Sequence, residues 1–362
     1  MYHSSHQFEP TSLSERQLQE VRPLAESIAH SSIKLTSAAH ETTRAALRAL
    51  LRQMNSFYSN RIEGQSTHPQ NIEPALHSDF SHQPYEARLQ RIALAHIGAE
   101  KEMEAQLVER PALQSAFLIH VHRALYDRLA PQDRVADEGE IIVPGQLRTR
   151  DVQVARHVAP TADSLPAFLR RLDEVYGKAR GWERILIETA CAHHRVAWVH
   201  PFLDGNGRIA RAVADMLLAR ADQSKQRFYS MSAQIQKERN EYYNILESTQ
   251  KGDLDITPWL DWFLNCLFRS MESTDITIEK ILERGQFWES HKDKTFNVRQ
   301  QIMLQSLLDS FFGNLNVSKW AKMTKTSTDT ALRDIKDLIE KDILIQEGAG
   351  RNTSYKLKNH NF

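Results

Sequence analysis

Apolar residues recur at steps of three and four along most of the chain, which predicts a predominantly helical protein. The chain has only 13 glycines and 12 prolines, a composition that favours helices over turn-rich β architecture. Residues 1–12 are polar and are expected to form a mobile arm, and Gly64, Pro69 and Pro74 mark a looped break. Helices are expected over 14–58, 85–108, from Pro111 onward, 164–176, 181–199, 207–220, 236–246 and 258–268.

Two stretches depart from this helical pattern. Residues 140–148 predict two short extended segments around a Pro-Gly turn, and the extended character continues to residues 152–154. The tail predicts a compact mixed domain, because three helical segments precede two short extended ones and a glycine-rich turn. These segments are 298–311, 317–323 and 328–341, then 343–345 and 354–357. Three helices followed by a two-stranded hairpin are the pattern of a winged helix.

The sequence therefore predicts an all-α fold class with one short β-hairpin and a C-terminal winged-helix domain. We place an N-terminal helical region at 1–110 and a helical core at 111–270. A charged linker helix is expected at 271–294, ahead of a winged-helix-like domain at 295–362.

Composition excludes several classes of protein. The 46 basic and 46 acidic residues cancel, so there is no global charge for coating nucleic acid or an acidic membrane. Both cysteines, Cys191 and Cys266, lie in apolar helical stretches, which speaks against a disulfide framework or a thiolate zinc site. No secretory signal and no apolar run long enough to cross a membrane is apparent, so we expect a cytoplasmic protein without membrane contact.

Residues 200–211, HPFLDGNGRIAR, concentrate polar chemistry between two apolar helices. Gly205, Asn206 and Gly207 can present successive backbone N–H groups at the start of the second helix, where the helix dipole favours an anion. Arg208 and Arg211 are three residues apart and so lie on one side of that helix, where their guanidinium groups can hold further phosphate oxygens. The segment predicts a phosphate site.

Two more residues of this segment suit reactions of phosphates. Asp204 offers a hard oxygen ligand for Mg²⁺, and His200 titrates near neutrality and is placed to act as a base. Taken singly, a histidine before Pro-Phe is more often structural, and an arginine pair is usually a solvated face. Because one site would use all these elements in this order, the phosphate site is the better interpretation. No Walker sequence or HExxH motif occurs, which speaks against a P-loop enzyme or a metalloprotease.

The segment matches the motif HPFx[DE]GNGRxxR of the Fic family (filamentation induced by cAMP), which the chain resembles over roughly residues 110–268. The resemblance implies a Fic helical core that transfers AMP from ATP to a protein hydroxyl, with Mg²⁺ bound at Asp204. It implies that His200 is the catalytic base, and that residues 204–208 and Arg211 bind the nucleotide phosphates.

A second motif lies upstream. The sequence SNRIEG, Ser59–Gly64, resembles the inhibitory motif [ST]xxxE[GN] of the family, which in one subclass lies on an N-terminal helix. Glu63 falls at the predicted end of a helix, where the dipole disfavours a carboxylate by about 0.3–1 kcal/mol. A solvated glutamate tolerates this position. The resemblance instead implies that Glu63 pairs with Arg211 and that this pair blocks the productive position of the ATP γ-phosphate.

The resemblance also assigns a β-hairpin flap and contacts to the adenine of the nucleotide. The flap at 145–157 would pair with an extended segment of the target protein, since a sheet edge offers free N–H and C=O groups. Ala155–Arg156 stands where glycine and histidine occur in close relatives, and Gln250 stands where asparagine occurs. The residues expected near the nucleotide are Val154, Ala155, Arg156 and His157 on the flap, and Tyr242, Tyr243 and Gln250 on a later helix.

Several alternatives stay open. The same scaffold serves transfer of UMP or phosphocholine, and some relatives use the glutamate to activate water and remove AMP. We expect automodification, and for the tail either docking to protein, including a homodimer, or binding to DNA. Between residues 329 and 342, the third tail helix and the residue after it carry Arg333, Lys336 and Lys341 against five acidic residues, which favours protein over DNA.

Overall fold

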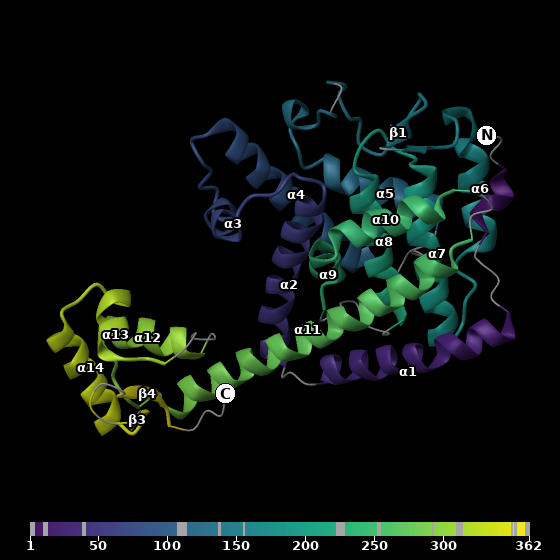
Figure 1. Cartoon of the computed structure of the whole chain (residues 1–362). Helices are drawn as coiled ribbons and strands as arrows, with labels where there is room; N and C mark the ends of the chain where they lie inside the picture. The colour runs from purple at the N-terminus through teal and green to yellow at the C-terminus, as the bar shows by residue number, and fades with distance from the viewer. Residues whose placement is uncertain are drawn as a thin grey trace. The chain divides into compact units, whose positions relative to one another are not determined.

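The computed structural model divides the chain into two compact units, Met1–Thr274 and Asp275–Phe362, and each is considered by itself (Figure 1). The described residues are 4–9, 14–37, 41–106, 114–136, 139–154, 156–221, 229–251, 255–291, 293–308, 314–348, 350 and 353–358. In these described residues, the first unit is helical apart from one hairpin, and the second combines the end of a long helix and three short helices with another hairpin.

The N-terminal arm is partly ordered by one aromatic residue, which corrects the expectation of a mobile arm over 1–12. Ser4 caps the short 3-10 helix η1, Ser5–Phe8, through a reciprocal capping box. Phe8 is 1% exposed and packs against the rings of Phe168 and Tyr176, with centroid distances of 6.0 and 5.8 Å. A single buried aromatic is enough to dock a polar segment.

Two N-terminal helices replace the single helical stretch expected over 14–58. They are α1, Glu15–Ser37, and α2, Glu41–Ile62. The expected break after Gly64 contains a further helix, α3, Pro69–Leu76, because proline at the first helical position loses no hydrogen bond. Helices α4, Pro84–Gln106, and α5, Ser115–Tyr126, follow where helices were predicted, and Pro111 lies outside the described residues.

The core of the first unit is built on two packed helices, α7, Trp182–Val199, and α8, Asn206–Ala221. Helix α6, Leu165–Val175, precedes them. The helix predicted over 236–246 is two helices, α9, Met231–Lys237, and α10, Arg239–Thr249, which meet at Glu238. The Glu238 carboxylate accepts hydrogen bonds from Arg269 at 2.7 and 2.7 Å, a tertiary contact that local periodicity cannot predict.

Helix α11, Thr257–Ser290, is longer than the predicted 258–268 and runs through the boundary between the units. In the first unit its Trp259 and Phe263 are fully buried, as expected for core positions. Cys191 of α7 and Cys266 of α11 are both buried and are not joined in a disulfide. Within the described part of the chain, no helix has the length and hydropathy needed to cross a membrane.

The hairpin of the first unit lies later in the chain than the extended pattern suggested. Strand β1, Gln153–Val154, pairs antiparallel with β2, His157–Val158. Residues 140–148 do not form the predicted extended pair, and the bridge recorded there joins Ile141 to Val135. Side chains satisfy the backbone of this loop instead, since His122 Nδ1 accepts the N–H of Gly145 at 2.7 Å.

The second unit has the element order predicted for the tail. Helices α12, α13 and α14 precede an antiparallel pair, β3 and β4, and Leu315 forms a further bridge with Tyr355. The fully buried Trp320 lies in the core of this unit. The winged-helix assignment itself stays a prediction. The bounds are Val298–Leu308 for α12, Val317–Met323 for α13, Thr328–Glu340 for α14, Leu344–Glu347 for β3 and Ser354–Leu357 for β4.

Candidate active site

The loop between α7 and α8 is shaped by residues 200–206. His200 ends α7 with left-handed backbone angles (φ 51°, ψ 60°), and Gly205 turns the chain into α8 at φ 83°. A side chain at Gly205 would collide with the hydroxyl of Tyr126, so this position requires glycine. The Asn206 amide accepts the N–H of Phe202 at 2.9 Å and donates to its carbonyl at 2.8 Å. The Asn206 side chain therefore fastens the loop, which leaves the α8 amides to face an anion.

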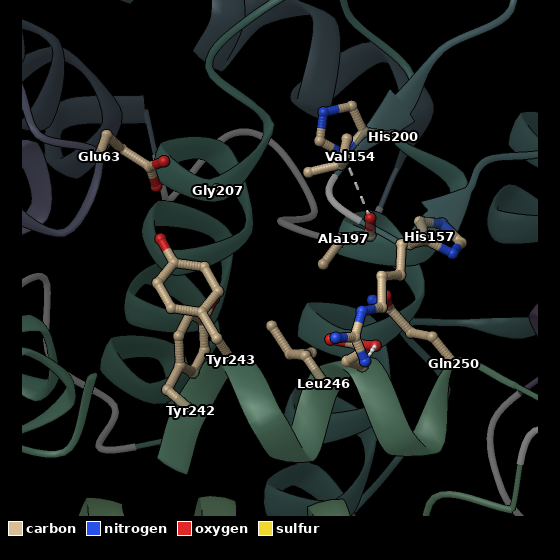
Figure 2. Close-up of a pocket in the computed structure, with 12 residues that line it drawn as sticks. Glu63, Val154, His157, Ala197, His200, Gly207, Tyr242, Tyr243, Leu246 and Gln250 are labelled. Atoms are coloured by element: carbon tan, nitrogen blue, oxygen red, sulfur yellow. Dashed lines mark hydrogen bonds and ion pairs between the residues drawn. The ribbon is translucent and has the colours of Figure 1, made fainter. Parts of the chain in front are cut away.

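His200 is held as a neutral base. Its Nδ1 lies 3.4 Å from the carbonyl oxygen of Ala197, which can only accept, so this contact assigns the proton to Nδ1 and the lone pair to Nε2. Burial lowers the pKa of His200 to about 4, against a smaller opposing effect of the Ala197 carbonyl. The ring lines a pocket (Figure 2). At neutral pH it can therefore accept a proton from a hydroxyl.

The backbone around His200 is fixed by Arg148, a residue that sequence reasoning missed. Its Nε donates to the carbonyl of His200 at 2.8 Å, Nη2 donates to the carbonyls of Val199 and Pro160, and Nη1 donates to that of Arg150 at 2.8 Å. The guanidinium is buried among carbonyl groups, and this burial lowers its pKa. No local pattern marks such an arginine, because its partners lie up to 52 positions away.

Arg208 and Asp204 form a buried network with Tyr126 of α5, a second residue that the sequence did not indicate. The Tyr126 hydroxyl donates to Asp204 Oδ2 at 2.7 Å, and Arg208 Nη2 donates to the same carboxylate oxygen at 3.0 Å. Burial opposes the charge on Asp204, but Arg208 and Tyr126 outweigh it, so the pKa of Asp204 is lowered. Arg208 also donates to Gln65 at 3.2 Å, just beyond the SNRIEG motif.

Glu63 lies against the start of α8, as the SNRIEG motif suggested. Helix α2 ends at Ile62, and the Glu63 carboxylate accepts a hydrogen bond from Arg211 Nη2 at 2.7 Å. Arg211 also donates to the hydroxyl and the carbonyl of Ser59, each at 3.0 Å. A Cβ added at Gly207 would collide with Glu63 Oε1, so the carboxylate lies at the first turn of α8 (Figure 2). It takes the place that the helix dipole offers to a phosphate.

A pocket of about 230 Å³ joins these elements to the hairpin and to α10. This volume is below the roughly 300–1,000 Å³ usual for small-ligand sites, and Glu63 forms part of the wall beside Gly207. The predicted site residues that line it are Glu63, Val154, Arg156, His157, His200, Gly207, Tyr242, Tyr243 and Gln250 (Figure 2). Asp204, Gly205, Asn206, Arg208 and Arg211 lie at the same end of α8 without forming its wall. Ala155 lies outside the described residues.

The residues around Asp204 can be compared with those that usually hold Mg²⁺. Among the described residues, no group of three or more His, Cys, Asp or Glu side chains is arranged to hold a metal ion. Asp204 is a single carboxylate, and Mg²⁺ in phosphate-transfer sites is commonly held by one or two carboxylates, water and the phosphates themselves. The residues therefore fit an ion that binds together with a nucleotide.

Comparison with known proteins agrees with this geometry. Residues 112–218 match the model of the Fic/DOC family. The chain contains a Fic domain over these residues. Protein adenylyltransferases Fic from Drosophila yakuba and Drosophila ananassae are 26% and 25% identical to it over 175 residues. That match covers 48% of this chain but only 32% of each relative, so the chain spans about a third of the length of these curated relatives.

Solved Fic structures share the fold. A Fic family protein from Desulfovibrio desulfuricans G20 aligns over 98% of this chain and 99% of its own, with a TM-score of 0.56 at 16% identity. Fic-1 from C. elegans aligns over 72% of this chain and 73% of its own, with a TM-score of 0.59 at 17% identity. The all-α class with a Fic core, predicted from the sequence, is confirmed.

Proposed function

We propose that this protein transfers AMP from ATP to a Ser, Thr or Tyr hydroxyl of a target protein and that Glu63 autoinhibits the transfer. One observation carries the proposal: the neutral base His200 shares a pocket with Gly207 at the start of α8, where a glutamate carboxylate held by Arg211 occupies a site suited to phosphate. The names of the Drosophila relatives, protein adenylyltransferase Fic, support the same reaction.

The chemistry follows from the positions of these groups. Neutral His200 accepts the proton of the target hydroxyl, the hydroxyl oxygen forms a bond to the α-phosphorus, and the bond to pyrophosphate breaks. Amides at the start of α8, with Arg208 and Arg211, stabilise the phosphate charge. Asp204 would hold a Mg²⁺ ion that neutralises part of this charge when the nucleotide is bound.

The adenine of ATP and the target protein would bind at the other walls of the pocket. Tyr242 and Tyr243 of α10 and Gln250 just after it line the pocket beside the hairpin, where an adenine would bind. Strand β1 has both its residues exposed, so an extended target segment can add to its edge through backbone hydrogen bonds. The same edge would accept a segment of this protein in automodification.

The isotope position in ATP tests the reaction. With the purified full chain in the Glu63→Gly form and Mg²⁺, we expect protein-bound label from α-labelled ATP and none from γ-labelled ATP. A mass increase equal to AMP on a hydroxyl residue should accompany it. Label from the γ position would identify a kinase instead. Stronger labelling from α-labelled UTP would assign UMP transfer, which would contradict the proposal for ATP.

A second candidate function, binding of double-stranded DNA, is favoured by the charges on α14. Asp334 is turned to α12, where Arg299 donates to it at 2.7 and 3.0 Å, and Asp337 is hydrogen-bonded to the same helix. These contacts pair two of the acidic residues of α14 within the domain, while Asp329 and Glu340 stay exposed on the helix. Arg333 and Lys336 are exposed on the face opposite the core. A helix with basic residues on its outer face suits a DNA groove.

A mobility-shift assay at several salt concentrations checks this second candidate. We expect the full chain to retard a duplex of mixed sequence. The Arg333→Ala/Lys336→Ala variant should lower the salt slope by about two, because each of the two side chains would neutralise one phosphate. The control is Arg16→Ala/Lys101→Ala, which removes two exposed charges from α1 and α4 of the first unit. A chain that retards no DNA at low salt would contradict the candidate.

A further inference from the structure

The C-terminal carbonyl group of α2 is bound by a different helix. The last carbonyls of a helix have no partner within it. The N–H groups of Gly64 and Gln65 turn back to the carbonyls of Arg61 and Asn60 at 3.0 and 2.8 Å, with Gly64 at φ 74°. The carbonyl of Ile62 is satisfied from outside, by side chains of α10.

Two side chains of α10 converge on this carbonyl. Arg239 donates to the oxygen of Ile62 from Nε at 3.2 Å and from Nη2 at 3.1 Å, and the Tyr243 hydroxyl donates to it at 3.2 Å. The Arg239 guanidinium lies over the Tyr243 ring at 5.0 Å, and the side chain of Ile62 is fully buried. A cation at a helix C-terminus is stabilised by the helix dipole.

These contacts fix the residue just before the inhibitory carboxylate. Glu63 is held by its side chain through Arg211, and its position along the chain is set by the bonds from Arg239 and Tyr243 to Ile62. Arg239 is exposed and is not part of the pocket wall. Tyr243 has two contacts, since its side chain lines the pocket and its hydroxyl binds the end of α2.

We propose that Arg239 and Tyr243 are positioning residues for autoinhibition: they latch the end of α2 so that Glu63 stays at the start of α8. The proposal rests on the proposed function of this site and adds the element that holds the inhibitor in place. Because Tyr243 lines the nucleotide pocket, the latch also couples that pocket to α2. Binding energies coupled in this way act reciprocally, so a loosened latch favours the nucleotide as well.

The test is an increase in activity after removal of an arginine. Arg239→Gln is expected to raise labelling from α-labelled ATP roughly five- to fiftyfold, within the usual range of about 5–150-fold for a coupling between sites. Tyr243→Phe, which keeps the ring and removes the hydroxyl, should give a smaller rise, and Arg239→Lys should remain close to the parent. In the Glu63→Gly background, Arg239→Gln should add nothing. The matched control is Arg269→Gln, because Arg269 binds the neighbouring Glu238 and should not change labelling.

A structural readout separates the latch from the chemistry. Hydrogen exchange of the amides at 59–65 should be faster in Arg239→Gln than in the parent chain and unchanged in Arg269→Gln. If Glu63→Gly transfers AMP while Arg239→Gln neither gains activity nor exchanges faster, the latch is wrong and the proposed function stands. If Glu63→Gly transfers nothing, the proposed function fails, and the exchange rates alone decide whether Arg239 holds the end of α2.

Discussion

Replacement of Glu63 by glycine is expected to raise the transfer of AMP about ten- to a hundredfold. The Glu63 carboxylate forms a hydrogen bond of 2.7 Å with Arg211, whose side chain is 3% exposed. A hydrogen bond to a charged group contributes about 1.5–3 kcal/mol, and each 1.4 kcal/mol corresponds to about a factor of ten. Without Glu63, that interaction becomes available to the γ-phosphate, and the first turn of α8 is no longer covered.

The fold should survive this substitution. Arg211 keeps two hydrogen bonds to Ser59 at 3.0 Å, so its guanidinium is not left without acceptors. Initial rates of labelling from α-labelled ATP, with melting temperatures of both proteins, provide the measurement. The control is Asp133→Asn, which weakens another ion pair between an arginine and a buried carboxylate, the pair with Arg91 of α4. Equal rates for Glu63→Gly and the parent would remove autoinhibition from the proposal.

The sequence predicted the part of the site whose residues are neighbours in the chain. His200, Gly207 and the two arginines fall in one loop and the first turns of one helix, so spacing and helical periodicity fix their relation. Glu63 lies 148 positions from Arg211, and only the SNRIEG motif, not any periodicity, connected the two. The long apolar helices were likewise predictable, because their stripe of buried residues repeats.

The residues that support the site were not predictable from a single sequence. Arg148, Tyr126 and Arg239 reach the site from other parts of the chain, and each is one polar residue without a repeating pattern around it. The extended pair predicted over 140–148 was wrong for a related reason, although the flap expected at 145–157 includes the observed strand β1. Apolar residues at 141–143 resemble a strand, yet the loop backbone is bound by side chains such as that of His122, whose position depends on the tertiary fold. Tertiary contacts override local preference in such segments.

Replacement of His200 by alanine is expected to lower AMP transfer about 10²–10⁴-fold, the usual contribution of a general base. The measurement uses the Glu63→Gly background, where activity is released, and His30→Ala is the control, because His30 is exposed on α1. Loss of less than about tenfold on His200→Ala would exclude the residue as the base.

The pH dependence follows from the same histidine. Burial lowers the pKa of His200 to about 4, so its neutral, proton-accepting form persists from pH 8 down to pH 5, whereas an ordinary histidine is half protonated near pH 6.5. The turnover number should therefore stay nearly level across pH 5–8, and a midpoint near 6.5 would contradict the assignment. Circular dichroism at each pH must accompany the rates.

Burial also lowers the pKa of His96, His122 and His193 to about 3. The unfolded chain therefore binds more protons than the folded chain below pH 6.5, and the free energy of unfolding decreases as the pH is lowered. A loss of rate that tracks unfolding would then reflect these buried histidines, and a loss in the folded protein would reflect His200.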